Sequence, residues 1–230
     1  MNLPDPSDYI DIHTHYGTPP LADIFSVISL LAHEKADPVP VKGIAYTFGI
    51  HPWYLTGSLH DDQIADVKKA AGDSSIIAIG EAGFDKIKGP DTDLQRKTFE
   101  EQVSVAEEHG KPVVIHCVRA WDELLRSHKR LRPSRPWLVH GFRGNKELAA
   151  QLISKGMFLS FWFDFIVRPE AGKLILSLPG ERIFLETDGS GTDIRDIYKK
   201  VSADLDLTVA ELKNTIYNNF INFFDVIPLA

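Results

Sequence analysis

The stretch YIDIHTH, residues 9–15, combines a strand-like apolar pattern with polar residues at alternate positions. Alternate side chains of a β-strand share a face, so Asp11, His13 and His15 are expected to point the same way. The two imidazoles would then converge about 7 Å apart along the strand, near enough to bind one ion. A pair of exposed or internally hydrogen-bonded histidines is the ordinary alternative, and the two-residue spacing alone does not decide between them.

Four further apolar runs also end in a residue type that binds metals. They are residues 75–81, 112–116, 137–140 and 183–188, which end in Glu81, His116, His140 and Asp188. Burying a carboxylate or an imidazole costs free energy unless the group is paired or bound to an ion. A polar residue after one strand is common, but the repetition over five strands is better explained by a shared metal centre.

Apolar runs of this kind recur along the chain with amphipathic segments between them, which is the order expected of β/α units around a parallel sheet. The expected strands are residues 9–15, 24–31, 43–51, 75–81, 112–116, 137–140, 157–161 and 183–188. Residues 91–110 and 208–224 have an apolar stripe at helical spacing. We therefore predict an α/β protein with one (β/α)8 TIM-like barrel domain over residues 1–230, whose carboxyl strand ends meet at one face.

The connections between the first three expected strands are short. Residues 16–50 must hold one strand and two connections, whereas a parallel crossover with its helix normally takes a dozen or more residues. Pro19, Pro20, Pro38 and Pro40 disfavour helix in these connections. We predict that the helical connections here are shortened to loops.

Composition limits the class of protein and its partners. Hydrophobic residues make up 43% and charged residues 25% of the chain, the balance of a globular protein with a sizeable core. The formal net charge is −7, so any contact with a polyanion must be local. Cys117 is the single cysteine and the N-terminal residues lack a signal-peptide pattern, which favours a reducing, cytoplasmic compartment. The most apolar stretch, residues 157–167, is too short to span a bilayer, so no membrane partner is expected.

Short motifs follow one another in order along most of the chain. They are DIHTH (11–15), GIHPW (49–53), IGEAGFD (79–85), VIHC (114–117), VHGFRGN (139–145), LETD (185–188) and NFINFF (219–224). With these motifs the chain resembles the TatD-like metal-dependent hydrolases, a branch of the amidohydrolase-type barrels. The resemblance implies a (β/α)8 barrel with one or two divalent ions and metal-dependent deoxyribonuclease activity.

The resemblance also implies which residues do the chemistry. The implied ligands are His13, His15 and Asp188 for one ion, His116 and His140 for the second, and Glu81 bridging both. Two such ions lower the pKa of a shared water and clamp the oxygens of a phosphoryl group. Glu81 and Asp188 are the expected catalytic residues, and Asp188 either accepts the water's proton or serves as a ligand alone. Asp11 is expected behind the ligands, where it would fix an imidazole tautomer.

The ligand set leaves the metal open. Mixed imidazole and carboxylate ligands suit Zn, Mn, Fe or Ni more than Ca, and Mg remains possible because members of the family are often assayed with it. The expected cofactor is therefore one or two divalent ions of undetermined identity.

Three residues are candidate substrate contacts: His51, Arg119 and Arg143. The planar guanidinium of an arginine fits a phosphate, although an exposed arginine is an equally common alternative. Relatives place Arg two and Asp three positions after the metal histidine, where this chain has Val118 and Arg119, so the register of Arg119 is open. His51 is either a substrate or phosphate contact or a histidine hydrogen-bonded within its loop.

Two further features remain open on sequence grounds. The aromatic residues between 158 and 165 either stack on unpaired bases or pack as the seventh strand, and packing is favoured. Glu186 shares a strand face with Asp188, as a partner behind a ligand or as a core carboxylate.

The sequence thus predicts a hydrolase that cleaves phosphodiester bonds in DNA from an end. DNA or a nucleotide is the expected partner, with no obligate protein partner. Two alternatives remain: the same centre acting on a small amide, lactone or phosphomonoester, and a non-catalytic binding protein on a degenerate barrel.

Overall fold

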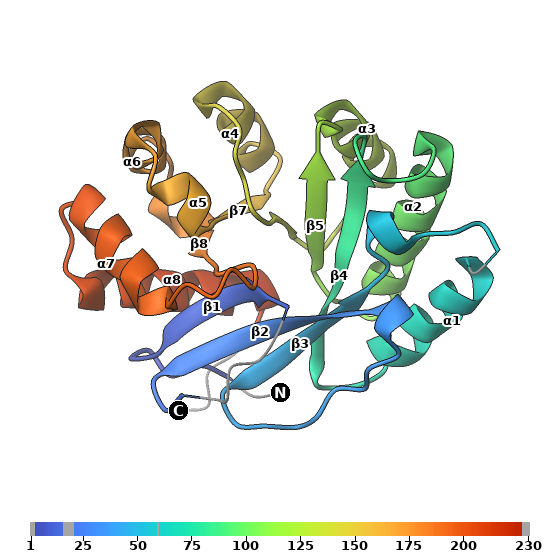
Figure 1. Cartoon of the computed structure of the whole chain (residues 1–230), viewed down its shortest axis with the longest axis horizontal. Coiled ribbons are helices and arrows are strands. Elements are labelled where there is room, and N and C mark those ends of the chain that lie inside the picture. Colours follow the sequence, from blue (N-terminus) through green and yellow to red (C-terminus); the bar gives the residue numbers. More distant parts are fainter. Residues whose placement is uncertain (1–2, 16–20, 59, 227–230) are drawn as a thin grey trace. The chain divides into compact units, whose positions relative to one another are not determined.

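The computed structural model describes residues 3–15, 21–58 and 60–226 of the chain. Within these residues it contains eight strands, which alternate with helices from the third strand onward (Figure 1). The chain divides into two compact units. Unit 1 comprises residues 29–40 and 46–139, and unit 2 comprises the residues up to 28, residues 41–45 and the residues from 140 onward.

Unit 1 is built on parallel strands in chain order. They are β3 (Ile44–Gly49, mostly in this unit), β4 (Ile76–Asp85), β5 (Val113–Val118) and β6 (Trp137–Val139). The helices are α1 (His60–Ala71), α2 (Thr92–Glu108) and α3 (Trp121–Leu131). α1 and α2 pack on β4, and α3 packs on β4 and β5. Every residue of β4 is buried, so this strand forms the centre of the unit.

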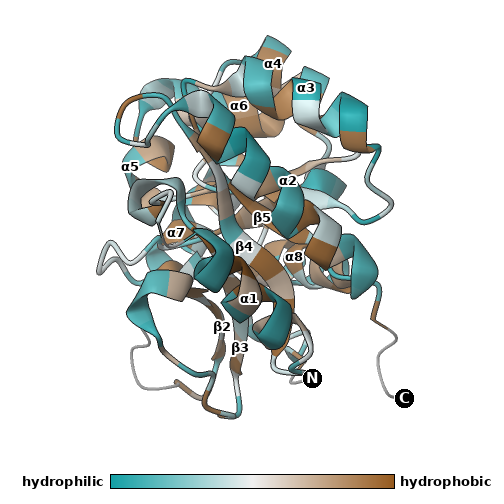
Figure 2. Ribbon diagram, turned by 90° about the vertical axis from the view of Figure 1, so that its right-hand side faces the viewer, coloured by the Kyte–Doolittle hydropathy of each residue, from teal (hydrophilic) through white to brown (hydrophobic). Residues whose placement is uncertain are grey.

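Helix α2 shows how the sequence pattern produces the packing. The Asp91 side chain accepts a hydrogen bond from Leu94 N at 2.9 Å, which caps the first turn. Phe99 and Val103 are buried on the predicted stripe, and the Phe99 ring lies 5.3 Å from that of Trp137 on β6. The hydropathy colouring follows this division, with hydrophobic strands and hydrophilic outer helix faces (Figure 2).

Unit 2 holds the first and the last strands of the chain. They are β1 (Tyr9–Thr14), β2 (Ile24–Leu31, mostly in this unit), β7 (Phe158–Phe161) and β8 (Ile183–Leu185). β1 pairs in parallel with β2, and β7 with β8. Asp188 N donates to His13 O at 3.1 Å, so the segment after β8 lies beside β1. A neighbouring first and last strand is what closure of a parallel barrel requires.

The helices of unit 2 follow its strands. They are α4 (Lys146–Ile153), α5 (Phe163–Ile166), α6 (Pro169–Leu176), α7 (Ile194–Asp204) and α8 (Val209–Phe224). α8 begins at a capping box, in which Thr208 and Glu211 each accept a hydrogen bond from the other's backbone N–H. Its buried face includes Leu212, Ile216 and Phe220, on the stripe that the sequence predicts.

The connections between the early strands are short, as predicted. Between β2 and β3 the structure has the 3-10 turn η1 (Ala32–Glu34), and no α-helix precedes α1 in the described part of the chain. Pro19 and Pro20 lie outside the described residues. Among the described helices, none has both the length and the apolar character needed to cross a bilayer.

Two strand ends differ from the prediction by three residues or more. β4 continues past Glu81 to Asp85, because its pairing with β5 runs on through Asp85 and Val118. β8 ends at Leu185, so Asp188 lies on the following loop, where its φ is 51°. The carboxylate of Asp188 is therefore positioned by a loop rather than by a strand.

Candidate metal centre

Unit 2 brings three of the predicted ligands together at the ends of β1 and β8. His13 Nε2 and His15 Nε2 lie 3.8 Å and 3.5 Å from Asp188 Oδ1, and one ligand atom of each residue lies within 4.8 Å of the others. With metal–ligand bonds of about 2.1 Å, tetrahedral ligand atoms are about 3.4 Å apart. The donor set and its spacing therefore fit a divalent ion.

The strand geometry explains why the two histidines meet. The pairing of β1 with β2 shifts register between Asp11 and Thr14. The rings of His13 and His15 lie 5.0 Å apart between centroids, closer than the spacing expected for a regular strand. The His13 side chain is fully buried, whereas those of His15 and Asp188 are 25% and 22% exposed. This cluster is thus open to solvent on the side of His15 and Asp188.

Asp11 supports the same cluster through the loop that carries Asp188. Its carboxylate accepts hydrogen bonds from Thr187 N at 3.0 Å and from Thr187 Oγ1 at 2.6 Å. Burial raises the pKa of Asp11 to about 7, against the opposing effect of the Thr187 hydrogen bonds. The structure therefore shows Asp11 holding the residue next to Asp188, and the expected contact with an imidazole stays a prediction.

His140, the fourth predicted ligand in unit 2, is supported by Glu186. His140 Nδ1 lies 3.4 Å from Glu186 Oε1, and Ser160 Oγ donates to the other carboxylate oxygen. The His140 ring lies 4.2 Å from the His13 ring between centroids. Carboxylates behind metal-binding histidines fix the ring orientation and tautomer. Glu186 thus lies beside a predicted ligand, and its role as a partner behind that ligand stays a prediction.

Unit 1 brings the remaining two predicted ligands together. Glu81 Oε1 lies 2.8 Å from His116 Nδ1 and 3.2 Å from His51 Nε2, and one ligand atom of each lies within 4.8 Å of the others. All three residues are buried. His51, expected as a substrate contact, thus lies against a predicted ligand, and its contact with a substrate stays a prediction.

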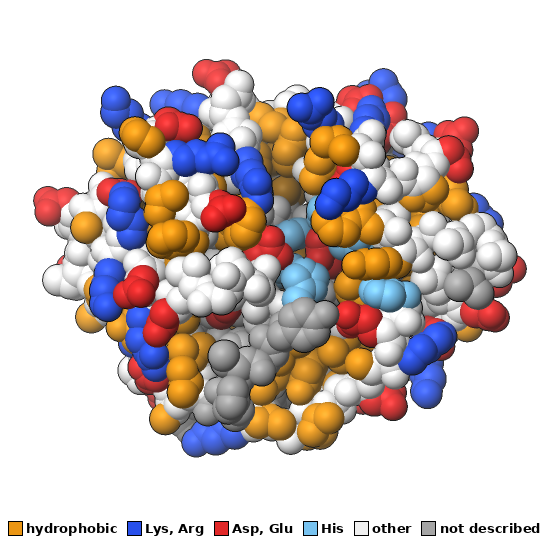
Figure 3. Space-filling model, viewed as in Figure 1, with side chains coloured by type: hydrophobic (Ala, Val, Ile, Leu, Met, Phe, Trp, Pro, Cys, Tyr) orange, Lys and Arg blue, Asp and Glu red, His pale blue; other side chains and the backbone are white. Residues whose placement is uncertain are grey.

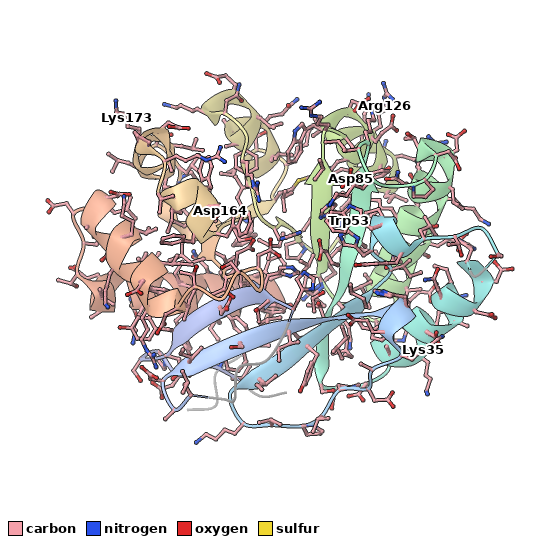
Figure 4. All side chains as sticks on the ribbon, in the orientation of Figure 1. Lys35, Trp53, Asp85, Arg126, Asp164 and Lys173 are labelled. Carbon is pink, nitrogen blue, oxygen red and sulfur yellow. The ribbon has the colours of Figure 1, made fainter. Side chains whose placement is uncertain are left out.

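Asp85 and Trp53 are site residues that sequence reasoning missed. Asp85 Oδ2 lies 3.2 Å from His116 Nε2 and accepts a hydrogen bond from Trp53 Nε1 at 2.6 Å (Figure 4). Burial alone would raise the pKa of Asp85. Hydrogen bonds from Trp53 and from the backbone of Lys88 and Ile87 outweigh it and hold the pKa at about 2. An anionic Asp85 is therefore in place to orient the His116 ring.

A sequence signal for Asp85 existed. Glu81, Gly83 and Asp85 alternate, and so share one face of β4. Placing the strand end at Glu81 hid this relation.

The two candidate arginines lie on loops. Arg119, after β5, is exposed and has a φ of 52°, and the described residues include no ion pair to it. Arg143, after β6, is exposed, and its guanidinium lies 4.2 Å above the Trp162 ring. The substrate contacts expected of Arg119 and Arg143 stay predictions. Burial raises the pKa of the Cys117 thiol, which agrees with a structural role for this residue.

Comparison with known proteins gives a consistent result. The family model described as TatD related DNase matches residues 28–225. The 3'-5' ssDNA/RNA exonuclease TatD of Cronobacter sakazakii is 30% identical over 188 residues, which cover 76% of this chain and 68% of that protein. A second such exonuclease, from Edwardsiella piscicida, is 29% identical over 67% of this chain and 61% of its own length.

Solved structures show the fold. The crystal structure of YjjV, a TatD homologue from Escherichia coli, has a TM-score of 0.76 and 20% identity, covering 97% of this chain and 100% of that chain. A hydrolase of the TatD family from Entamoeba histolytica has a TM-score of 0.73 and 17% identity, covering 97% of this chain and 99% of its own.

The fold and the imidazole–carboxylate clusters at its strand ends define a class, that of the metal-dependent hydrolases built on a (β/α)8 barrel. Within that class, the chain belongs to the TatD related DNase family. The predicted family and fold class are confirmed. The extent of the domain over residues 1–230 stays a prediction.

Proposed function

We propose that the protein is a divalent-metal-dependent exonuclease that hydrolyses phosphodiester bonds at an end of single-stranded DNA. The observation that carries this proposal is the cluster of His13, His15 and Asp188, whose ligand atoms lie within 4.8 Å of one another in a member of this family. Relatives named as 3'-5' ssDNA/RNA exonucleases support the substrate and extend it to RNA.

The proposed ligand assignment follows the family pattern. His13, His15 and Asp188 would hold one ion, and His116, His140 and Glu81 are the further residues that the family pattern assigns to divalent ions. Bound divalent ions lower the pKa of water and stabilise charge on phosphoryl oxygens. The donor set suits Zn, Mn, Fe or Ni, and Mg fits less well by ligand type.

The protein's own groups have distinct tasks in this proposal. Asp188 is the partly exposed carboxylate, and it accepts the proton of the attacking water at a side-chain oxygen. Asp11 holds the Asp188 loop through Thr187, and Glu186 orients His140. Asp85 does the same for His116, with Trp53 fixing the carboxylate.

Exposed aromatic side chains beside His51 favour a nucleic acid over a small amide, lactone or phosphomonoester. Trp53 and Tyr54 are 40% and 42% exposed, and their rings lie 4.8 Å and 5.8 Å from that of His51. Tyr54 also stacks on His33 at 3.7 Å. Stacking on aromatic side chains holds unpaired bases without reading their sequence.

The proposal places the enzyme in the cytoplasm, a reducing compartment that suits the single Cys117. The substrate contacts the protein locally, because the chain as a whole carries a net charge of −7. No obligate protein partner takes part in the reaction.

The test is hydrolysis by metal-stripped protein to which each metal is restored in turn. The substrates are a 5'-labelled single-stranded 12-nucleotide DNA, its duplex, and small ester, amide and lactone compounds. We expect metal-dependent shortening of the single strand. A ladder of labelled products indicates digestion from the 3' end, and immediate release of the labelled nucleotide indicates the 5' end. Hydrolysis of a small compound with intact DNA would contradict the proposal in favour of the alternative substrate class.

A further inference from the structure

Unit 2 contains a cleft of about 480 Å³ that the metal clusters do not use. It is lined by the loop after β6, the start of α4, and α5 and α6. The basic residues of the lining are Arg143, Lys146, Arg168 and Lys173, and its acidic residue is Glu170. Phe165 and Leu174, both buried, form an apolar floor. Lys and Arg side chains gather on the face over α5 and α6 (Figure 3).

The charge of this cleft is opposite to that of the whole chain. The lining of the cleft has four basic side chains and one acidic side chain, whereas the formal net charge of the protein is −7. A cleft in unit 1 shows the contrast, because its Lys35 and Lys69 are offset by Asp37, Asp66 and Asp73. The cleft of unit 2 therefore has the local positive charge that contact with a polyanion requires.

Two arginines of the cleft are held in place by their own neighbours. The Arg143 guanidinium lies 4.2 Å above the Trp162 ring, which leaves the N–H edge of the plane for hydrogen bonds. Arg168 Nε donates a hydrogen bond to Asp164 O at 3.1 Å. This bond uses one N–H of the guanidinium, and the two terminal nitrogens can still donate to a ligand. Such positioned forks suit phosphate oxygens, because less conformational freedom is lost on binding.

The cleft also begins in a loop of the candidate metal centre. Arg143 is three positions after His140, and Asn145 then caps α4 through a hydrogen bond from Leu148 N at 3.0 Å. The N-terminal end of α4, which carries a partial positive charge, adds to the field of Arg143 and Lys146. The cleft and His140 therefore share one loop, three residues apart along the chain.

We propose that this cleft binds the sugar–phosphate backbone of single-stranded nucleic acid, on nucleotides away from the bond that is cleaved. Phosphates contact the basic side chains, and a base or sugar covers the apolar floor of Phe165 and Leu174. The proposal rests on the proposed nuclease function and adds a site that makes binding depend on substrate length.

The test compares two triple charge reversals of equal total charge. The cleft variant is Lys146→Glu with Arg168→Glu and Lys173→Glu, and the control is Lys42→Glu with Lys129→Glu and Lys155→Glu, all at exposed positions. Lys146 begins α4 and Lys155 lies two residues beyond its last residue, so the two lysines lie at opposite ends of the same helix. An acidic residue at the start of a helix is favourable, so Lys146→Glu is not expected to unfold α4.

The readout is the binding of a fluorescent dT12 with phosphorothioate linkages at both ends, measured by fluorescence anisotropy at several salt concentrations. For single strands each lost phosphate contact lowers the slope of log K against log salt by about 0.7. We expect the cleft variant to bind dT12 about tenfold more weakly than the wild type. We also expect the magnitude of its salt slope to be smaller by about 2, since three phosphate contacts are lost. We expect the control to change affinity less than about twofold, as non-contacting charges are screened.

Kinetics give a second readout. The KM for dT12 rises in the cleft variant, whereas hydrolysis of a p-nitrophenyl ester of a single nucleotide stays at the wild-type rate. Equal losses of dT12 binding in the two triple variants would overturn the proposal. Binding of a glutamate 12-mer as tightly as dT12 would also overturn the proposal, because it would show a surface that attracts any polyanion.

The outcomes separate this site from the proposed function. Cleft-dependent binding of dT12 by a protein that does not hydrolyse DNA supports the site and contradicts the nuclease. Hydrolysis of DNA with unchanged binding in the cleft variant supports the nuclease and overturns the site.

Discussion

The His13–His15–Asp188 cluster of unit 2 and the His51–Glu81–His116 cluster of unit 1 use the same residue types but differ in packing. In unit 2 the imidazole nitrogens lie 3.5 Å and 3.8 Å from Asp188 Oδ1, and two of the side chains are about a quarter exposed. In unit 1 the Glu81 side chain is 2% exposed and lies 2.8 Å from His116.

This difference has a physical consequence for metal binding. In unit 1 an incoming ion must replace hydrogen bonds that the ligands already make to one another, whereas in unit 2 the spacing already suits an ion. The partial exposure of unit 2 also leaves room for water and a phosphate. We therefore expect unit 2 to bind the first ion, and unit 1 to bind more weakly.

The largest effect is expected from the two carboxylates. Asp188→Asn and Glu81→Gln each remove a negative charge from a proposed metal site, which costs several kcal/mol of transition-state stabilisation and on the order of 10³-fold in kcat/KM. Oligonucleotide hydrolysis measures the loss, and the melting temperature checks that both variants fold. The exposed Asp164→Asn in unit 2 is the control and should keep wild-type activity. Full activity in either carboxylate variant would show that the substituted residue is not needed for the reaction.

Histidine substitutions test the order of metal binding. His15→Ala should weaken the first ion by more than the roughly 100-fold upper limit of substitutions behind a ligand, because it removes a direct ligand of the open cluster. His116→Ala should leave the first ion in place and affect only later binding. Titration against a chromophoric chelator measures both affinities. First-ion affinity that falls in His116→Ala and not in His15→Ala would reverse the proposed order.

A smaller effect is expected from Asp11→Asn. The variant keeps one acceptor for Thr187 and loses the other, so the Asp188 loop is held less firmly. Substitutions behind metal ligands typically cost 10–100-fold in metal affinity or activity, and we expect a loss of about tenfold. Thr187→Val provides the second arm of a double-mutant cycle, measured by metal titration. Additive losses in the double variant would show that the two residues act independently.

The smallest effect is expected from Trp53→Phe, and it depends on pH. The pKa of Asp85 is about 2, below its ordinary value of 3.8, so the stabilising contribution is present above about pH 4 and is lost as pH falls toward 2. Removing the indole donor should lower the free energy of unfolding by about 1 kcal/mol at neutral pH, because Trp53 is 40% exposed and water can replace part of the lost hydrogen bond. Urea unfolding between pH 2 and 7 should show this difference shrinking below pH 4. If the difference in unfolding free energy persists at pH 2, its cause is the lost packing of the indole rather than its hydrogen bond to Asp85.

The sequence was sufficient to predict the fold class and the residue types of the site. Alternation through β1 and the residue after it predicts His13 and His15 on one face, and the apolar runs that lead to Glu81, His116 and His140 identify the carboxyl ends of strands. These relations are local, so a single strand carries them. The short early connections followed from the prolines and the limited chain length.

The supporting contacts could not be predicted because they join distant segments. Thr187 is 176 positions from Asp11, and Trp53 is 32 positions from Asp85. A strand pattern gives the face on which a side chain lies but not its partner on another strand or loop. Asp85 was missed for an additional reason, since the glycines between Ile79 and Phe84 lower the strand propensity of β4 where it in fact continues.

The central claim is that imidazole and carboxylate groups far apart in the sequence bind divalent ions together. Anomalous diffraction from crystals grown with Mn²⁺ tests it most directly. We predict a strong peak about 2.1 Å from His13 Nε2, His15 Nε2 and a carboxylate oxygen of Asp188. Anomalous peaks elsewhere on the protein, with none within bonding distance of these three side chains, would contradict the account.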